Sequence, residues 1–114
     1  MANERISDGI VSRELSLDPY RPMKSSNGAV TASATIAAAS GEALDDNVVA
    51  ITVSNTHTTE TLYVQFDGSA ADVTAFPLPA GSGTTIPGDS ESLADVRLYA
   101  GSSITVGFIP YRLY

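Results

Sequence analysis

The chain has 114 residues, of which 43% are hydrophobic and only 17% are charged, so we expect a single domain with one modest core. It contains no cysteine, which excludes disulfide bonds and thiolate metal sites. The net charge is −7, and after residue 28 only Arg97 and Arg112 oppose the carboxylates. An acidic body repels phosphates, so we expect no nucleic-acid partner.

The first 28 residues differ from the rest because their charges cancel and two prolines, Pro19 and Pro22, flank Tyr20 and Arg21. Proline fixes φ and favours extended geometry in the preceding residue. We therefore divide the chain into an extended N-terminal arm, residues 1–28, with a short strand over residues 10–17, and a β-sandwich domain, residues 29–114. We expect the arm to dock on a partner or on a neighbouring copy.

Neither a secretion signal nor a membrane span is expected. The first residues after Met1 are polar, and no segment approaches the roughly 20 apolar residues that a span requires. The sequence therefore predicts synthesis in the cytoplasm and no membrane partner.

Small apolar and hydroxylated side chains alternate through residues 29–37, which predicts a strand. One face of that strand would carry Val30, Ala32, Ala34 and Ile36. The alanines that continue to Ala39 leave a helix as the alternative. Gly41 and the run 45–47 then predict a turn.

The alternation of apolar and polar side chains is clearest in two pairs of segments, which we interpret as β-hairpins. The first pair is 49–53 and 62–66, joined by a threonine-rich turn. The second is 96–100 and 104–108, and Pro110 is expected to end its pairing. The residues expected to face the core are Val49, Ile51, Val53, Leu62, Val64, Phe66, Val96, Leu98, Ile104, Val106 and Phe108.

Shorter strands are expected at 76–78 and 84–86, within a region rich in proline and glycine. About seven short strands with turns between them predict an all-β fold. We expect a single small β-sandwich or jelly-roll-like barrel with an extended N-terminal arm.

Few residues of the sequence are candidates for catalysis or for metal binding. His57 is the lone histidine and lies among threonines at a predicted turn, so a solvated turn residue is favoured over a catalytic base. One histidine cannot form a multi-histidine metal site. The Asp45–Asn47 turn lacks the spacing of a calcium loop, and no phosphate-binding glycine loop is present. We expect no enzymatic activity, no cofactor and no metal.

Tyrosines are the best candidates for a binding surface. By alternation Tyr63, Tyr99 and Ile109 face away from the core, and a tyrosine on an outer sheet face provides contact area with a polar tip. Covering a sheet edge is an equally weighted alternative. The residues expected to contact a partner are Ile10, Leu15, Leu17, Tyr20, Arg21, Tyr63, Tyr99 and Tyr111.

Five segments carry a resemblance to a known class: residues 51–56, 61–66, 76–78, 96–100 and 104–106. Together they resemble small virion proteins of tailed bacteriophages. In those proteins a hairpin with a threonine-rich turn precedes a loop rich in proline and glycine and a closing strand with leucine, tyrosine and alanine. The resemblance covers residues 48–109 and not the arm.

The resemblance implies a structural protein without catalytic residues, most specifically a capsid decoration (cement) protein. Such a protein would lie on the capsid surface of the virion and clamp major capsid subunits. A homo-oligomer such as a trimer is also expected, because association would supply the stability that the missing disulfides do not. The alternatives are an adaptor in the tail, neck or baseplate, and a carbohydrate-binding module whose tyrosines stack on sugar rings.

Overall fold

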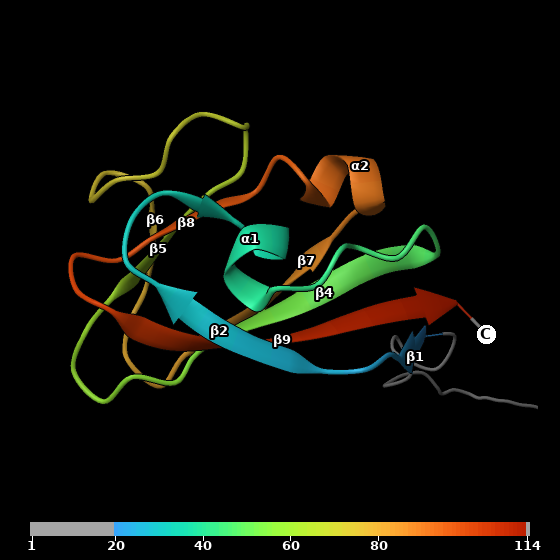
Figure 1. Ribbon diagram of the computed structural model, residues 1–114, viewed down its shortest axis with the longest axis horizontal. Helices are drawn as coiled ribbons and strands as arrows, with labels where there is room; N and C mark the ends of the chain where they lie inside the picture. Colours follow the sequence, from blue (N-terminus) through green and yellow to red (C-terminus); the bar gives the residue numbers. More distant parts are fainter. Residues whose placement is uncertain (1–19, 114) are drawn as a thin grey trace, which may run out of the picture.

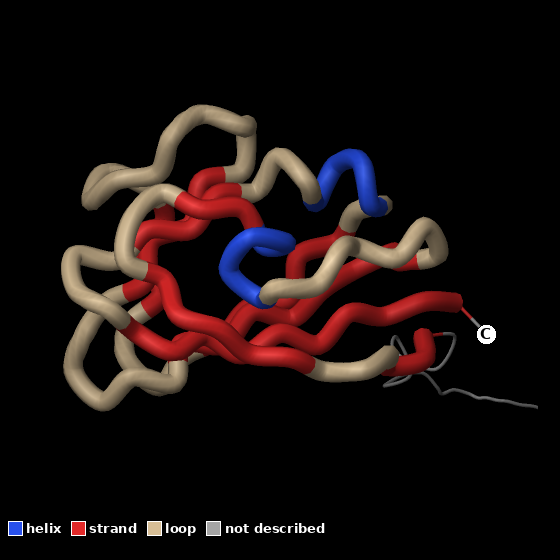
Figure 2. Tube along the Cα trace, in the orientation of Figure 1, coloured by secondary structure: helices blue, strands red, loops and turns tan. Residues whose placement is uncertain are grey.

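Alternating apolar residues form the strands of two antiparallel sheets in the computed structural model, which describes residues 20–113 (Figures 1 and 2). In the five-stranded sheet β9 (Ile104–Leu113) and β4 (Val48–Asn55) are central, β7 (Gly83–Pro87) lies beside β4, and β1 (Tyr20–Pro22) and β2 (Ser26–Val30) share the far side of β9. The four-stranded sheet has the order β3 (Ala34–Thr35), β8 (Arg97–Tyr99), β5 (Leu62–Gln65) and β6 (Phe76–Leu78). The all-β sandwich expected from the sequence is confirmed, with nine described strands rather than about seven.

The inner face of the five-stranded sheet is covered partly by the four-stranded sheet and partly by two helices. The four-stranded sheet covers one half, where Val64, Leu98 and Val106 are completely buried. Two short helices, α1 (Ile36–Ser40) and α2 (Ser90–Leu93), cover the other half through Ile36 and Leu93 (Figure 1). The core is therefore continuous, but only part of it is packed between sheets.

Both predicted hairpins are wrong. β4 pairs with β7 and β9, whereas β5 pairs with β6 and β8, so residues 56–61 cross from one sheet to the other. The segment between β8 and β9 crosses in the same way. A strand with one buried face alternates identically whether its successor lies beside it or across the core, so alternation could not distinguish the two arrangements.

Three predictions about single positions in the strands are also wrong. Phe66 is 47% exposed because β5 ends at Gln65, before the alternation reaches it. Val49 is only half-buried because a bulge shifts the register of β4 and turns Val48 inward instead. Pro110 does not end β9, since it lies where the neighbouring strand changes from β1 to β2 and its carbonyl accepts a hydrogen bond from the Met23 N–H at 2.8 Å.

Residues 29–37 do not form one strand. β2 ends at Val30, and α1 begins at Ile36 after a bend and the two-residue β3. Thr35 caps this helix, with its hydroxyl accepting from the Ala38 N–H at 3.1 Å, and Gly41 ends it with a left-handed φ of 76°. The helical alternative thus holds for residues 36–40, because the cap and the terminal glycine outweigh the alternation.

Residues 20–28, the described part of the predicted arm, lie in β1, β2 and the link between them. Both strands pair with β9 of the same chain. The strand predicted over residues 10–17 lies outside the described residues.

Candidate functional site: protein-binding surfaces

The turn that holds His57 is organised by hydrogen bonds to its imidazole. Nδ1 accepts from the backbone N–H groups of Thr59 at 3.1 Å and Glu60 at 3.0 Å. This geometry uses the ring nitrogen as a turn acceptor, in the manner of an Asx turn. The observation supports the structural interpretation of His57.

Asn55, the last residue of β4, is 1% exposed and ties this turn to the core. Its Nδ2 donates to the carbonyls of Glu60 at 2.8 Å and Leu78 at 3.0 Å, and its Oδ1 accepts from the His57 N–H at 3.1 Å. The side chain therefore joins the crossing between β4 and β5 to the end of β6. The sequence signal for this role is weak, because asparagine is equally common in exposed turns.

Residues 20–113 contain neither a cluster of potential metal ligands nor a helix that could span a membrane. Nowhere in that range do three histidine, aspartate or glutamate side chains gather as potential metal ligands. Neither described helix has the length and apolarity needed to cross a lipid bilayer.

The structure divides the residues predicted to contact a partner between two outer faces. Tyr20 and Tyr111 lie on the five-stranded sheet, and Tyr63 and Tyr99 lie directly opposite each other on the four-stranded sheet. Arg21 lies in β1, where alternation directs its side chain to the other side of the sheet from Tyr20. Ile10, Leu15 and Leu17 fall outside the described residues.

The outer face of the five-stranded sheet has no charged side chain at its described positions. Strand pairing defines this set, which we call the neutral face: Tyr20, Pro22, Asn27, Ala29, Ala50, Thr52, Ser54, Gly83, Thr85, Pro87, Thr105, Gly107, Ile109, Tyr111 and Leu113. Its most exposed large apolar side chains are Ile109 at 36% and Leu113 at 52%. In a protein of net charge −7, a sheet face without charged side chains distinguishes one side of the described molecule from the rest.

Hydrogen bonds hold the centre of the neutral face in place. The Thr52 hydroxyl donates to the Tyr111 hydroxyl oxygen at 3.1 Å, and the hydroxyls of Thr52 and Thr85 are 2.8 Å apart. These contacts join three strands and fix the ring of Tyr111 against the sheet. The face is therefore already ordered before any partner arrives.

The four-stranded sheet presents a different surface. The rings of Tyr63 and Tyr99 have centroids 6.3 Å apart and planes inclined at 46°. Gln65 and Arg97 continue the same face. The tilted rings do not form one flat platform of the kind that stacks against a sugar.

Exposed apolar side chains also gather at the loop between β5 and β6. Phe66, Val73 and Phe76, which we call the phenylalanine tip, are 47%, 63% and 54% exposed. The two phenylalanine rings lie 6.3 Å apart. Sequence analysis missed this cluster because it placed Phe66 in the core.

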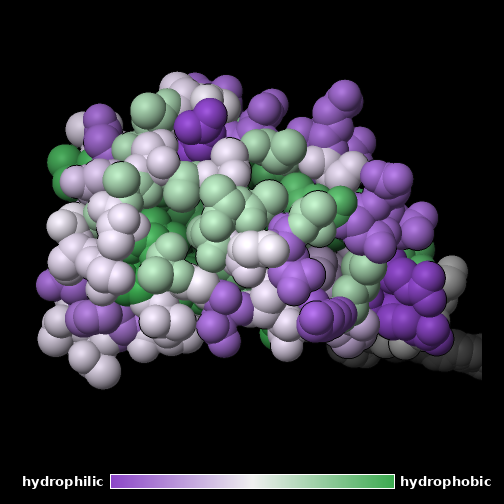
Figure 3. Space-filling model, in the orientation of Figure 1, coloured by the Kyte–Doolittle hydropathy of each residue, from purple (hydrophilic) through white to green (hydrophobic). Residues whose placement is uncertain are grey.

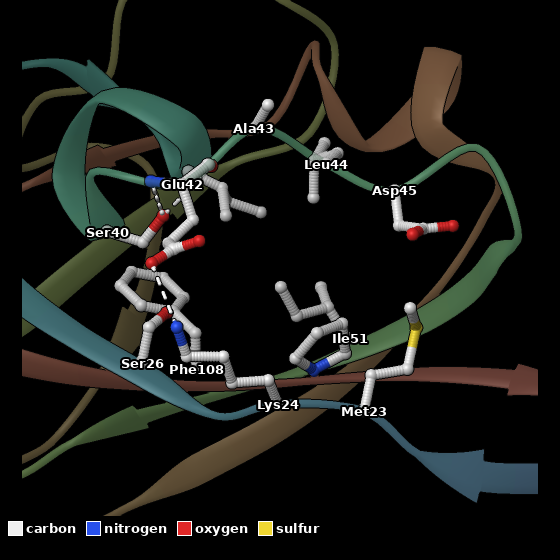
Figure 4. Close-up of a pocket in the computed structure, with 12 residues that line it drawn as sticks. Met23, Lys24, Ser26, Ser40, Glu42, Ala43, Leu44, Asp45, Ile51 and Phe108 are labelled. Carbon is white, nitrogen blue, oxygen red and sulfur yellow. Dashed lines mark hydrogen bonds and ion pairs between the residues drawn. The ribbon is translucent and has the colours of Figure 1, made fainter.

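A pocket of about 170 Å³ lies between the inner side of the β1–β2 edge and the segment that follows α1 (Figure 4). Ile36, Ile51 and Phe108 line its apolar interior, and Met23 and Leu44 approach it from opposite sides. At its rim the Lys24 Nζ lies 3.6 Å from a Glu42 carboxylate oxygen. Figure 3 shows hydrophobic side chains over the middle of this side of the molecule and hydrophilic ones at the end near β1.

Comparisons with protein-family models, curated proteins and solved structures found no match.

Proposed function

We propose that this protein is a non-catalytic structural component of a phage virion, most specifically a capsid decoration protein. The observation that carries the proposal is the neutral face, which we take as the surface that lies on major capsid subunits. Interface centres are depleted in charge and enriched in tyrosine, as this face is. The resemblance of residues 48–109 to small virion proteins supplies the more specific identity.

Charge supports this choice of surface. A protein of net charge −7 is repelled by acidic surfaces wherever its carboxylates approach them. Contact through the neutral face keeps those carboxylates away from the partner. The ordered Thr52–Tyr111 centre also reduces the entropy lost on binding.

The first experiment is copy counting by mass spectrometry on purified particles. Hundreds of copies per particle are expected for a shell protein. A dozen or fewer would assign the chain to the tail, neck or baseplate, and its absence from particles would refute a virion role. A glycan-binding screen with a Tyr63→Ala control tests the carbohydrate alternative, for which we expect no binding.

The second experiment tests the surface. Ile109→Glu and Leu113→Glu each place a carboxylate on the neutral face, and we expect either to weaken capsid binding by tenfold or more. Ser102→Glu adds the same charge to the exposed loop between β8 and β9 and serves as the control. Equal binding by all three variants would exclude the neutral face as the docking surface.

A further inference from the structure

We propose that the outer face of the four-stranded sheet binds a protein segment that carries a glutamate or aspartate beside apolar side chains, and that Arg97 receives the carboxylate. Strand pairing defines this surface, which we call the arginine face: Thr35, Tyr63, Gln65, Pro77, Arg97 and Tyr99. The neutral face lies on the other sheet, so the arginine face is a second surface and its role does not depend on the proposed virion role.

The guanidinium of Arg97 has no hydrogen-bond or ion-pair partner among residues 20–113. Its Nε is buried, so water does not take the place of the missing acceptor. Buried polar groups are almost always hydrogen-bonded, and a buried charged donor without an acceptor is costly. A carboxylate that bound the guanidinium side-on would accept from Nε and form a second, parallel hydrogen bond with a terminal amino group.

Charge favours a single carboxylate as the ligand. Arg97 carries the arginine face's one charge, in a protein of net charge −7. The neighbouring acidic residues lie elsewhere: Asp67 accepts hydrogen bonds from Ser69, and the Asp95 carboxyl group lies beside Gly68. A nucleic acid or another polyanion would be repelled by these carboxylates, whereas one acidic side chain on a peptide can meet the guanidinium alone.

The side chains around Arg97 suit a peptide. Tyr63 and Tyr99 lie opposite each other, and arginine and tyrosine are enriched among the residues that contribute most to binding at interfaces. Both tyrosines and Gln65 are half-buried, so none of them is fixed in the core. A partner that takes over their contacts can therefore displace them and reach the Arg97 Nε.

An apolar region adjoins the arginine face and explains why the segment should carry apolar side chains as well. The phenylalanine tip begins at its border, because Phe66 follows Gln65 and Phe76 precedes Pro77. The two phenylalanines are 47% and 54% exposed. A segment whose carboxylate is bound by Arg97 would place its neighbouring side chains against these rings and remove apolar surface from water.

Two blocked tripeptides test the recognition of the carboxylate: acetyl-Leu-Glu-Leu-amide and its glutamine analogue, which differ only in the charged group. Nuclear magnetic resonance on the isotope-labelled full chain follows the Arg97 Nε–H signal. We expect the glutamate peptide to shift this signal with a dissociation constant of about 1 mM, and the glutamine peptide to bind at least tenfold more weakly. Raising the NaCl concentration from about 50 mM to about 500 mM should weaken binding of the glutamate peptide at least threefold.

Substitutions separate recognition by the guanidinium from attraction by charge. Arg97→Gln should abolish the preference for the glutamate peptide, followed here by the Tyr63 ring signals. Arg97→Lys keeps the charge but not the planar pair of donors, so binding should weaken about fivefold. Arg112→Gln is the matched control, because it removes the same charge from β9 of the other sheet, and it should change binding less than twofold. Arg97→Gln should lower the melting temperature no more than this control does, since the Nε–H has no partner to lose.

Equal binding of the two peptides would overturn the proposal, as would the absence of binding by either peptide at about 10 mM. An equal loss of binding in Arg97→Gln and Arg112→Gln would show that net charge alone attracts the peptide. Inorganic phosphate is titrated against the same Arg97 signal. If it bound more tightly than the glutamate peptide, the site would be one for phosphate groups, and the proposal would again be wrong.

Discussion

The inner face of the five-stranded sheet is covered in two different ways. Where the four-stranded sheet lies on it, Val53, Val64 and Leu98 are fully buried. Where α1, α2 and residues 41–47 lie on it, Ile51 is also buried, but a pocket of about 170 Å³ lies beside it. Two sheets interdigitate along their whole contact, whereas each short helix covers only a narrow stripe. The first half is therefore the more tightly packed, and the second retains a hollow.

The largest expected difference between the halves follows from core truncation. Leu98→Ala leaves a closed cavity between the sheets and should lower the free energy of unfolding by about 4 kcal/mol. Ile51 is equally buried but borders the pocket, so Ile51→Ala enlarges an existing hollow and the loss should be about 2 kcal/mol. Urea unfolding measures both. Equal losses would show that the helical half is packed as tightly as the sheet half.

The next effect concerns the crossing between the sheets. Asn55→Ala removes the donor to the carbonyls of Glu60 and Leu78, which are then left without that partner. Unsatisfied buried groups are costly, so we expect the free energy of unfolding to fall by about 3 kcal/mol. Asn27→Ala, on the exposed edge strand β2, should change it by less than about 0.5 kcal/mol. If both variants were equally stable, the crossing would not depend on Asn55.

A smaller effect is expected where α1 packs on β2. A Cβ atom added to Gly28 would lie 1.7 Å from the Ala39 carbonyl oxygen, so the helix must move outward. We expect Gly28→Ala to cost about 2 kcal/mol, as overpacking typically does. Gly101→Ala is the matched control, because nothing lies within 4 Å of its added Cβ. Thermal unfolding compares the two variants, and similar melting temperatures would contradict the predicted overpacking at Gly28.

The strands of the fold could be predicted from the sequence, but their pairing could not. Period-two alternation identified β4, β5 and β9 and most of their buried residues, because one buried face is sufficient to impose that period. It could not say which strands pair. The crossing between β4 and β5 is held by Asn55 and by the hydrogen bonds of its turn, which alternation does not encode.

The binding surfaces were less predictable than the core. Tyr20 and Tyr111 meet on one face only because β1 pairs with the end of β9. The phenylalanine tip arises because β5 ends one residue before Phe66. Both facts concern strand registers and ends. The sequence therefore identified Tyr20 and Tyr111 as candidate contact residues, but it could not predict that they share one face of a sheet.

The smallest expected effect is a pH dependence of the loop that carries the phenylalanine tip. Hydrogen bonds from the side chain and then the backbone of Ser69 hold the pKa of Asp67 below its ordinary value of 3.8, and those from Thr74 do the same for the pKa of Asp72. Because the folded pKa values are lowered, the stabilisation is present above pH 3.8 and is lost as the pH falls through the folded values.

We therefore expect the melting temperature to fall as the pH is lowered below about 4, and to fall less in the double variant Asp67→Asn, Asp72→Asn. Asparagine keeps an acceptor oxygen for the same turns but does not titrate. The control Asp46→Asn, Glu91→Gln removes the same two charges at exposed positions where the described residues provide no side-chain hydrogen bond. If the double variant and this control lost the same number of degrees, the two turns would not contribute to acid sensitivity, and the order of the tip would have to come from Ala71 and Ala75 packing beneath the loop.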